Sequence, residues 1–341
     1  MPVSDPFLTR LEAKVRHQLR SQKVGYLIGA GASHLSGKGY PLASDLWDAI
    51  KGTLGDAERS DIQTKLDDGA GGLEAALDLL DPGNVTGSPH RHSVTASIAN
   101  LFRSMSTPLD WHMKFVERLS RRTEYSVPVF CLNYDPLVER AAEAAKVWLV
   151  DGFQGVEDAY FDPGLFQCLF GIERRGARYR QIAYKTGIIQ LFKLHGSLGW
   201  YESSQAGIRR CPFRQDIPAG TTRHMIPPQC RKANDTTLPP FSNLWSEFRR
   251  LVSQGPAPLH RLVCIGYGMR DEHVNAVLEA GLRGRDFTLL IFARQLAQDT
   301  FERWSSHSNA IVVTRDQCSL NQECGEGHPT LWDFQQLSQE V

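Results

Sequence analysis

Apolar residues fall into two alternating patterns along the chain, short continuous runs and longer stretches with a helical period. Continuous runs of this length are typical of buried strands, and they occupy 24–28, 127–132, 188–194, 262–265, 287–292 and 311–313. A helical period occurs over 7–22, 43–54, 136–145, 242–252 and 271–282. Strands that alternate with helices predict an α/β fold, in which a mostly parallel sheet is covered by helices on both faces.

Three segments depart from this alternation. The range 56–122 is helical in pattern throughout, with breaks around Pro82 and Pro108, and it predicts a helical insertion. The range 151–187 is rich in Gly, Arg and aromatic residues and is expected to be irregular. The range 202–238 is rich in polar residues and proline, which favours a surface insertion.

Composition and charge narrow the classes of function. The 341 residues, 41% of them hydrophobic and 22% charged, can bury a sizeable core. The 38 basic and 38 acidic residues give a formal net charge of +0, so direct binding to nucleic acid or to an acidic membrane surface is not expected. Basic pairs such as Arg249-Arg250 are expected on solvated faces.

Cysteine usage favours a reducing, cytoplasmic setting. The seven cysteines are odd in number and scattered, and Cys131 and Cys264 lie inside apolar runs. The first residues lack the basic start and apolar core of a signal peptide, and no apolar stretch is long enough to span a bilayer. Cys318, Cys324 and His328 have the spacing of no common zinc site, so we expect no metal.

Candidate chemistry lies directly after three of the predicted strands. A glycine turn, Gly29–Ser33, follows the first strand; Asn133 and Asp135 follow the second, and His195 follows the third. Because ligands bind at the carboxyl ends of parallel strands, these segments are expected to converge on one crevice. Glycines allow close approach of the backbone to a ligand, and histidine accepts protons near neutral pH. Together they suggest a site that attacks a dinucleotide.

Each segment also has a structural alternative. The turn Gly29–Ser33 departs from the full dinucleotide fingerprint, because His34 stands where the third glycine is expected, and a tight turn without a ligand fits it equally well. Asp135 could cap the helix that Pro136 opens. A lone histidine such as His195 is more often structural than catalytic.

Taken in order, these motifs resemble one family. They are the glycine turn followed by Gly39-Tyr40-Pro41 and Leu46-Trp47, then Asn133-Tyr134-Asp135, then Leu194-His195-Gly196-Ser197-Leu198 with Trp200, and finally the segment Ile265–His273. Their order and approximate spacing are similar to those of the sirtuin-like domains of prokaryotic antiphage systems. The resemblance runs from Val24 to His273, which is most of the chain.

The resemblance implies a single NAD-binding, Rossmann-like domain over 1–341. It implies cofactor contacts from Gly29, Ala30, Gly31, Ala32 and Ser33, from Pro41 in a flexible loop, and from Gly266, Tyr267 and Gly268 near the adenosine half. It further places Asn133 and Asp135 near the nicotinamide ribose. His195 would be the general base.

One departure from the family matters for the reaction. Deacylating sirtuins carry a four-cysteine zinc module, whereas the range 202–238 holds only Cys211 and Cys230. We therefore expect no zinc, and protein deacylation is disfavoured. Cleavage of NAD+ itself is favoured instead.

The function implied is an NAD+ glycohydrolase that releases nicotinamide and ADP-ribose, and so depletes cellular NAD during antiphage defence by abortive infection. Asn133 would orient ribose and water, Asp135 would hold ribose hydroxyls or offset positive charge, and His195 would accept a proton. Such an activity needs a gate, for which a HerA-type ring ATPase is the first candidate and an Argonaute-like protein the second, and it suggests a homo-oligomer. The alternatives are a regulatory or structural subunit that binds NAD or ADP-ribose without turnover, and a nuclease subunit of a defence complex.

Overall fold

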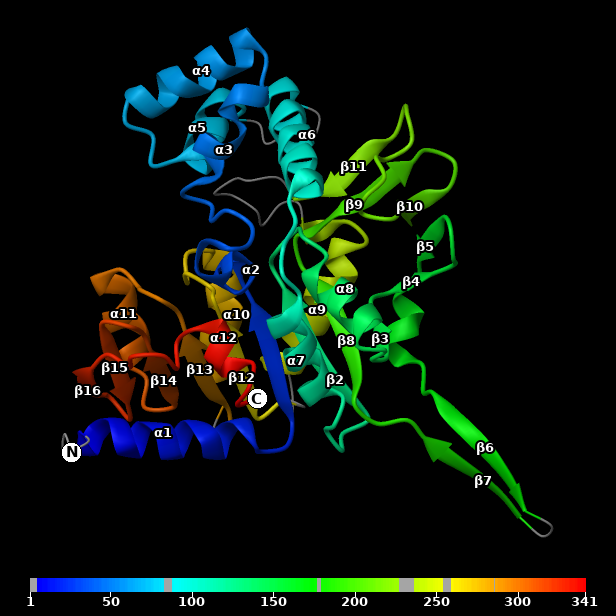
Figure 1. Ribbon diagram of the computed structural model, residues 1–341, viewed down its shortest axis with the longest axis vertical. Coiled ribbons are helices and arrows are strands. Elements are labelled where there is room, and N and C mark those ends of the chain that lie inside the picture. Colours follow the sequence, from blue (N-terminus) through cyan, green and yellow to red (C-terminus); the bar gives the residue numbers. More distant parts are fainter. Residues whose placement is uncertain (1–4, 83–87, 177–178, 227–235, 254–258, 285) are drawn as a thin grey trace.

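The computed structural model describes residues 5–341 apart from 83–87, 177–178, 227–235, 254–258 and 285 (Figure 1). In the described part of the chain, a sheet of nine strands forms the centre of the fold. Its parallel strands, in spatial order, are β14 (Ala310–Val313), β13 (Thr288–Phe292), β12 (Arg261–Ile265), β1 (Val24–Ile28), β2 (Ser126–Cys131), β8 (Ile188–Lys193) and β3 (Leu149–Val150). At the β14 edge, β15 (Gln317–Leu320) and β16 (Glu323–Glu326) continue the sheet in the antiparallel direction.

The order of the main strands is that of a doubly wound dinucleotide-binding sheet. If the two-residue edge strand β3 is left out, the strands β1, β2, β8, β12, β13 and β14 are the first to sixth parallel strands along the chain. Their spatial order is then 3-2-1-4-5-6. The connections reverse direction between β1 and β12, which is the point at which such sheets bind ligands.

Helices cover both faces of this sheet, as predicted. Side chains alternate along β1, so that Tyr26 and Ile28 face one side while Leu27 faces the other. The Tyr26 side packs against α1 (Pro6–Leu19), α7 (Asp110–Leu119), α8 (Leu137–Ala144) and α12 (Phe334–Leu337). The Leu27 side packs against α9 (Phe241–Val252), α10 (Glu272–Leu282) and α11 (Gln298–Ser305).

The described residues of 56–122 are largely helical, but their helices belong to two different hydrophobic clusters. Helices α4 (Asp56–Asp67), α5 (Leu73–Leu80) and α6 (Pro89–Ser104) share one cluster with α3 (Leu46–Ile50), which precedes the range, and with Leu137 of α8 and Leu198 and Met225 of the second sheet. They lie beyond the carboxyl ends of the parallel strands (Figure 1). In contrast, α7 buries Phe115, Val116 and Leu119 against the central sheet.

The expectation that 151–187 is irregular was wrong, because four short strands lie in its described residues, and the end of β9 together with β10 and β11 lies within 202–238. A second sheet has the order β11-β9-β10-β5-β4, and β6 pairs with β7 in a separate hairpin. The bounds are β4 (Phe153–Gln154), β5 (Ala159–Phe161), β6 (Gly171–Gly176), β7 (Tyr179–Tyr184), β9 (Gly196–Ser203), β10 (Gly207–Arg210) and β11 (Thr222–Met225). Strands β4, β5, β10 and β11 have only two to four residues, and β9, although buried over its first six residues, is interrupted by glycine and polar residues. These strands therefore lack the continuous apolar runs that marked the central sheet.

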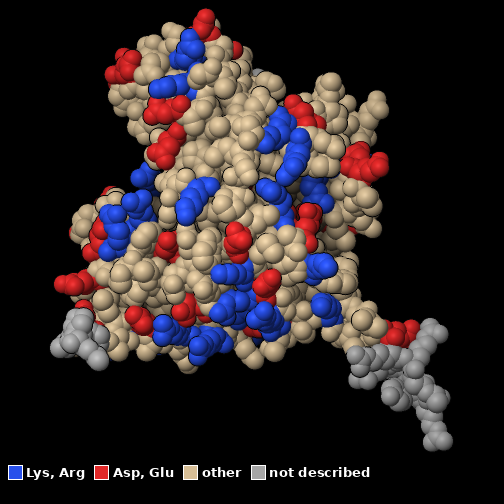
Figure 2. Space-filling model, viewed as in Figure 1, with Lys and Arg blue, Asp and Glu red and all other residues tan. Residues whose placement is uncertain are grey.

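The surface charge is mixed, and the carboxyl-terminal segment packs into the core. On the face drawn in Figure 2, Lys and Arg side chains are interleaved with Asp and Glu. Leu331 and Phe334 near the carboxyl terminus are buried in the core. Of the helices in the described residues, none combines the length and apolar character needed to cross a bilayer.

Candidate functional site

Four neighbouring strands of the central sheet end on one lateral row. The row consists of Ile265 in β12, Ile28 in β1, Cys131 in β2 and Lys193 in β8. Gly266, Gly29, Asn133 and His195 each follow this row by one or two residues. The sheet therefore brings the glycine turn, Asn133 and His195 to the same carboxyl-terminal edge, beside the point where the strand order reverses.

The side-chain amide of Asn133 is buried and its orientation is fixed. Its Nδ2 donates to the carbonyl oxygen of Gly29 at 2.9 Å and to Oγ of Ser33 at 2.8 Å. A carbonyl oxygen can only accept, so the amide nitrogen must be the group that faces Gly29. Both amide hydrogens are thereby used, which leaves Oδ1 to accept a hydrogen bond from a ligand or water.

The glycines of the turn are required by packing between two loops. The amides of Gly29 and Gly31 donate to the carbonyls of Ile265 and Gly266 at 2.9 and 2.8 Å. A Cβ atom at Gly29 would lie 2.6 Å from Cα of Tyr267, and one at Gly31 would lie 2.8 Å from Cα of Gly266. The loop after β1 is thus held directly against the loop after β12.

The helix that follows this turn is too short to act as a pyrophosphate site. Amino-terminal helix amides favour a pyrophosphate, but α2 (Ala30–His34) has only five residues. Leu35, which directly follows the helix, has a φ of +49°, and the amide of Gly31 is already bonded to the carbonyl of Gly266. α2 therefore positions Ser33 so that its Oγ accepts a hydrogen bond from Nδ2 of Asn133.

Asp135 performs the capping role that was its structural alternative. Its Oδ1 accepts from the amide of Leu137, the first residue of α8, at 3.0 Å. Its backbone carbonyl accepts from Nζ of Lys193, which is buried in β8. The carboxylate lies at the same edge as Asn133, with one oxygen engaged by α8.

A buried ion pair lies next to the carboxyl-terminal edge of the sheet and joins β8 to α8. Nζ of Lys193 lies 3.4 Å from Oε1 of Glu139 on α8. Burial raises the pKa of Glu139, because a carboxylate loses its hydration there. Burial alone would lower the pKa of Lys193, but the Glu139 carboxylate holds that pKa above its usual value. The pair ties β8 to α8, just below His195 and Asp135.

His195 has a partner that the sequence analysis did not select. Its Nε2 lies 3.4 Å from Nε2 of His273, which is in the first turn of α10. The indole of Trp245 on α9 lies beside both rings, with centroid distances of 6.3 Å to His195 and 4.7 Å to His273. His273 closes the segment Ile265–His273 that carried part of the resemblance. Because 78 residues separate the two histidines, only the strand order reveals their contact.

Among the other predicted cofactor contacts, the side chain of Tyr267 is engaged in hydrogen bonds with its own loop and with α10. The hydroxyl of Tyr267 accepts from the amide of Asp271 at 2.9 Å and lies 3.1 Å from Oδ1 of Asn275, so its side chain braces α10. Burial raises the pKa of Tyr267 far above its usual value. Gly268 follows it in the same loop, and only the backbone there remains for a ligand. Pro41 follows Tyr40, which stacks on Phe102 of α6 at 4.3 Å.

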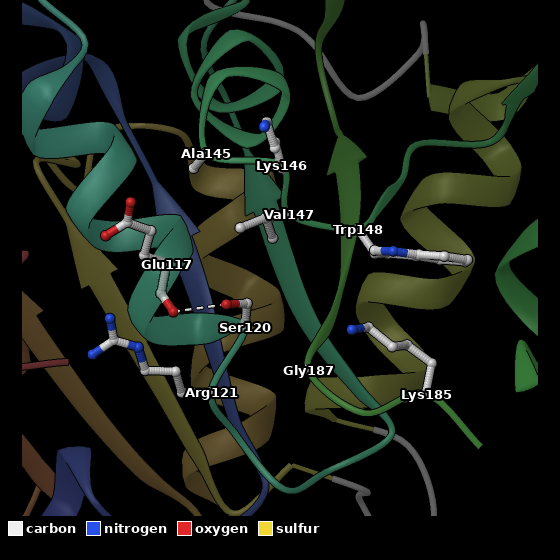
Figure 3. Close-up of a pocket in the computed structure, with 9 residues that line it drawn as sticks. All are labelled: Glu117, Ser120, Arg121, Ala145, Lys146, Val147, Trp148, Lys185 and Gly187. Carbon is white, nitrogen blue, oxygen red and sulfur yellow. Dashed lines mark hydrogen bonds between the residues drawn. The ribbon is translucent and has the colours of Figure 1, made fainter. Parts of the chain in front are cut away.

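A separate pocket of about 190 Å³ lies at the opposite edge of the sheet (Figure 3). Its lining residues come from segments that precede β2, β3 and β8, and they are Glu117, Ser120, Arg121, Ala145, Lys146, Val147, Trp148, Lys185 and Gly187. Nζ of Lys185 lies 6.0 Å from the ring centroid of Trp148. The candidate residues follow the strands, so this pocket is distinct from their site.

Within the described residues, no group of three or more His, Cys, Asp or Glu side chains is placed to hold a metal ion. Cys211 is free and half-buried, while Cys230 lies outside the described residues. Burial raises the pKa of the Cys131 thiol to about 12, so this cysteine beside Asn133 stays protonated at neutral pH. The polar chemistry at the edge comes from amide, carboxylate and imidazole groups.

No family model matches the chain, and no curated protein matches it in sequence. Among solved structures, the chain is similar to two Sir2 homologues at low identity. A mutant Sir2 homologue in complex with 2′-O-acetyl ADP-ribose is 15% identical, with a TM-score of 0.45 and 96% of each chain covered. A Sir2 homologue in complex with NAD is 15% identical, with a TM-score of 0.46, 99% of this chain covered and 92% of that chain.

Proposed function

We propose that the chain binds NAD+ across the carboxyl-terminal edge of the central sheet and hydrolyses the nicotinamide–ribose bond. The observation that carries this proposal is the strand order 3-2-1-4-5-6, with its reversal between β1 and β12. Asn133 and His195 stand beside that reversal, at the ends of the next two strands. A dinucleotide lying across the reversal would bring one of its halves to these two side chains.

The reaction needs a base and stabilisation of positive charge, but no strong acid. Water attacks C1′ of the nicotinamide ribose, the C–N bond breaks, and its electron pair passes to the pyridinium nitrogen. Nicotinamide then leaves as a neutral molecule, and the proton of the attacking water passes to a base. The transition state resembles an oxocarbenium ion, so carboxylate and amide oxygens nearby stabilise it.

In this proposal, three residues at the carboxyl-terminal edge supply the base and the oxygen atoms that the reaction needs. His195 is the proton acceptor, for which an imidazole suits neutral pH. Asn133 presents Oδ1 to the attacking water or to a ribose hydroxyl, since its Nδ2 is held by Gly29 and Ser33. Asp135 adds negative charge beside the ribose, while its capping bond to α8 holds it in place.

The biological setting follows from the family resemblance of the sequence motifs alone. In this proposal NAD+ depletion acts in antiphage defence, and a partner gates it. A HerA-type ring ATPase is the first candidate for that partner and an Argonaute-like protein the second, with the chain itself forming a homo-oligomer. Binding of NAD or ADP-ribose without turnover is the competing function.

The decisive experiment is incubation of the purified protein with NAD+, followed by chromatographic quantification of nicotinamide and ADP-ribose. Asn133→Ala removes the amide that is held by the glycine turn, and its rate is expected to fall by about 100-fold or more. Asn100→Ala, at an exposed position of α6, is the matched control and should retain the wild-type rate.

The outcomes separate the competing functions. Equal rates for wild type and a folded Asn133→Ala protein would contradict the assigned site. Calorimetric binding of NAD+ that Asn133→Ala weakens, without any nicotinamide release, would instead establish a binding subunit. Cleavage of plasmid DNA that requires His195 would favour the nuclease reading.

A further inference from the structure

The hairpin of β6 and β7 carries an excess of positive charge. Over 171–176 and 179–185 it holds four basic residues, Arg174, Arg175, Arg180 and Lys185, and one acidic residue, Glu173. Arg175 is paired directly with Arg180 across the two strands. Like charges at directly opposed positions destabilise a strand pair, so a negatively charged partner would stabilise this hairpin.

The hairpin also exposes large apolar side chains close to its base. A Cβ atom at Gly171 would meet the side chains of both Ile182 and Tyr184, so these two side chains share one face of the hairpin. Ile172, the next residue, belongs to the other face. Nine large apolar side chains are exposed in the described part of the chain, and exposed apolar surface that is gathered in one place marks a protein contact. Five of the nine lie in or beside the hairpin, and they are Trp148, Leu169, Ile172, Ile182 and Tyr184.

A surface of the opposite charge lies on the helical insertion. The range 56–81, which includes α4 and α5, holds eight acidic residues and two basic ones. The two basic residues, Arg59 and Lys65, already pair with Asp56 and Asp68. Leu79 on α5 is 59% exposed and adds an apolar side chain to this region. The exposed acidic side chains form the acidic helix surface, which consists of Asp56, Asp61, Asp67 and Asp68.

The hairpin and the acidic helix surface lie at opposite ends of the molecule. Figure 1 shows the hairpin at the lower right and α4 and α5 at the upper left, with the central sheet between them. A contact between these two regions therefore joins different molecules.

We propose that the β6–β7 hairpin of one copy binds the acidic helix surface of a second copy. The basic residues of the hairpin meet the aspartates of α4, and the exposed apolar side chains of the two regions cover one another. Complementary charge fixes which surfaces associate, while apolar burial adds affinity. Two copies can exchange hairpins reciprocally, and a ring can repeat the contact from copy to copy, so either assembly leaves no hairpin uncovered.

The charge balance of the chain favours a second copy over a nucleic acid. The formal net charge is +0, and both the positive and the negative excess belong to the same chain. A nucleic acid would pair with the basic residues through its phosphates but would leave Ile172 and Ile182 uncovered. This inference rests on the proposed function only for its homo-oligomer, and NAD+ hydrolysis plays no part in it.

The first test is reversal of charge on each surface, with assembly measured by sedimentation velocity. Arg175→Glu with Arg180→Glu, and in a second protein Asp67→Lys with Asp68→Lys, should each weaken self-association by about tenfold or more. An equimolar mixture of the two variants should associate as wild type does. In that mixture the reversed hairpin meets the reversed helix surface, and the unreversed hairpin meets the unreversed surface. A mixture that stays monomeric while wild type associates would overturn the proposal.

The second test concerns the apolar part of the contact. Ile172→Ser with Ile182→Ser should also weaken self-association, because both side chains are exposed in the single copy and buried in the assembly. Val156→Ser, between β4 and β5, is the matched control, since Val156 is 98% exposed and lies outside the hairpin. Circular dichroism should show all variants folded. Equal association of the hairpin variant and the control would contradict the apolar contact.

The outcomes separate this inference from the proposed function. Wild-type protein that is monomeric at every concentration would overturn both the contact and the homo-oligomer, whereas an oligomer that neither charge reversal weakens would overturn the contact alone. Nicotinamide release is measured separately and decides only the proposed reaction. Binding of a single-stranded oligonucleotide that Arg175→Glu with Arg180→Glu abolishes, with the oligomer unchanged, would assign the hairpin to nucleic acid instead.

Discussion

Gly266 holds the two loops of the candidate site together, and no larger residue fits in its place. Its φ of +63° lies in the left-handed region, and a Cβ atom there would lie 2.4 Å from the amide nitrogen of Ala32. Gly268, two residues later, has no such restriction, since its nearest atom would be Cγ of Arg270 at 4.0 Å. The two glycines look equivalent in sequence, yet their surroundings differ completely.

This difference gives a matched pair of substitutions. Gly266→Ala is expected to lower the free energy of unfolding by about 2 kcal/mol or more, because it adds backbone strain and a clash with the turn after β1. Gly268→Ala should change it by less than about 0.5 kcal/mol. Urea denaturation followed by circular dichroism measures both. Similar losses in the two variants would contradict the direct packing of these loops.

Individual site residues could be predicted only where the sequence places them at strand ends. Asn133 and His195 follow apolar runs, so their common edge could be expected from the sequence. The role of Asp135 was left open, and its bond to Leu137 is the capping interaction. His273 could not be predicted as the partner of His195, because nothing local in either segment indicates that β8 and α10 meet.

The sequence pattern predicts the buried strands of the central sheet well, and it does not predict the short strands of the second sheet. The main strands of the central sheet have continuous apolar runs, because both faces are covered by helices. The strands β4, β5, β10 and β11 have two to four residues each and are held by neighbours in their own sheet rather than by apolar periodicity. Their pairing depends on tertiary structure, which a local pattern cannot reveal.

The packing of α7 against α12 makes stability depend on pH. His112 on α7 is fully buried, its ring centroid lies 4.7 Å from that of Phe334, and neither ring nitrogen has a hydrogen-bond partner among the residues described. Burial lowers the pKa of His112 to about 4 from an ordinary value of 6.5. The folded state therefore favours the neutral ring.

As the pH falls through 6.5, the unfolded chain binds a proton that the folded chain does not, so stability should decrease until the pH reaches about 4. The difference in pKa corresponds to a loss of about 3 kcal/mol. In His112→Leu this part of the pH dependence should disappear, whereas His17→Leu, at an exposed position of α1, should retain it. Urea unfolding between pH 4 and 7 measures the effect. Parallel curves for wild type and His112→Leu would show that His112 is not its source.

The order of strands in the central sheet is a property that no single segment carries. Periodicity could predict six buried strands and their parallel direction, but not that β12 adds beside β1 rather than beside β8. That choice determines which loops touch, because it places Gly266 against Gly31 and brings His273 to His195. The site is thus a consequence of topology, and its residues follow four neighbouring strands in the middle of the sheet, β12, β1, β2 and β8.

The hairpin of β6 and β7 contributes little to this arrangement. Among the described residues these strands pair only with each other, and Figure 1 shows them extending away from the central sheet. Ile172 and Ile182 are 70% and 55% exposed, so they stabilise no core. An isolated two-stranded hairpin is marginally stable in water, and a flexible loop in its place costs little entropy.

Replacement of 172–183 by a short Gly/Ser linker should therefore change the free energy of unfolding by less than about 1 kcal/mol and leave nicotinamide release unchanged. The contrasting variant replaces β10, which pairs with both β5 and β9 and whose loss would split the second sheet. That variant is expected to be strongly destabilised in urea denaturation. A large loss of stability in the hairpin variant would show that the hairpin packs against the body of the protein. A loss of activity alone would show that it belongs to the catalytic assembly, since the fold would then be intact without it.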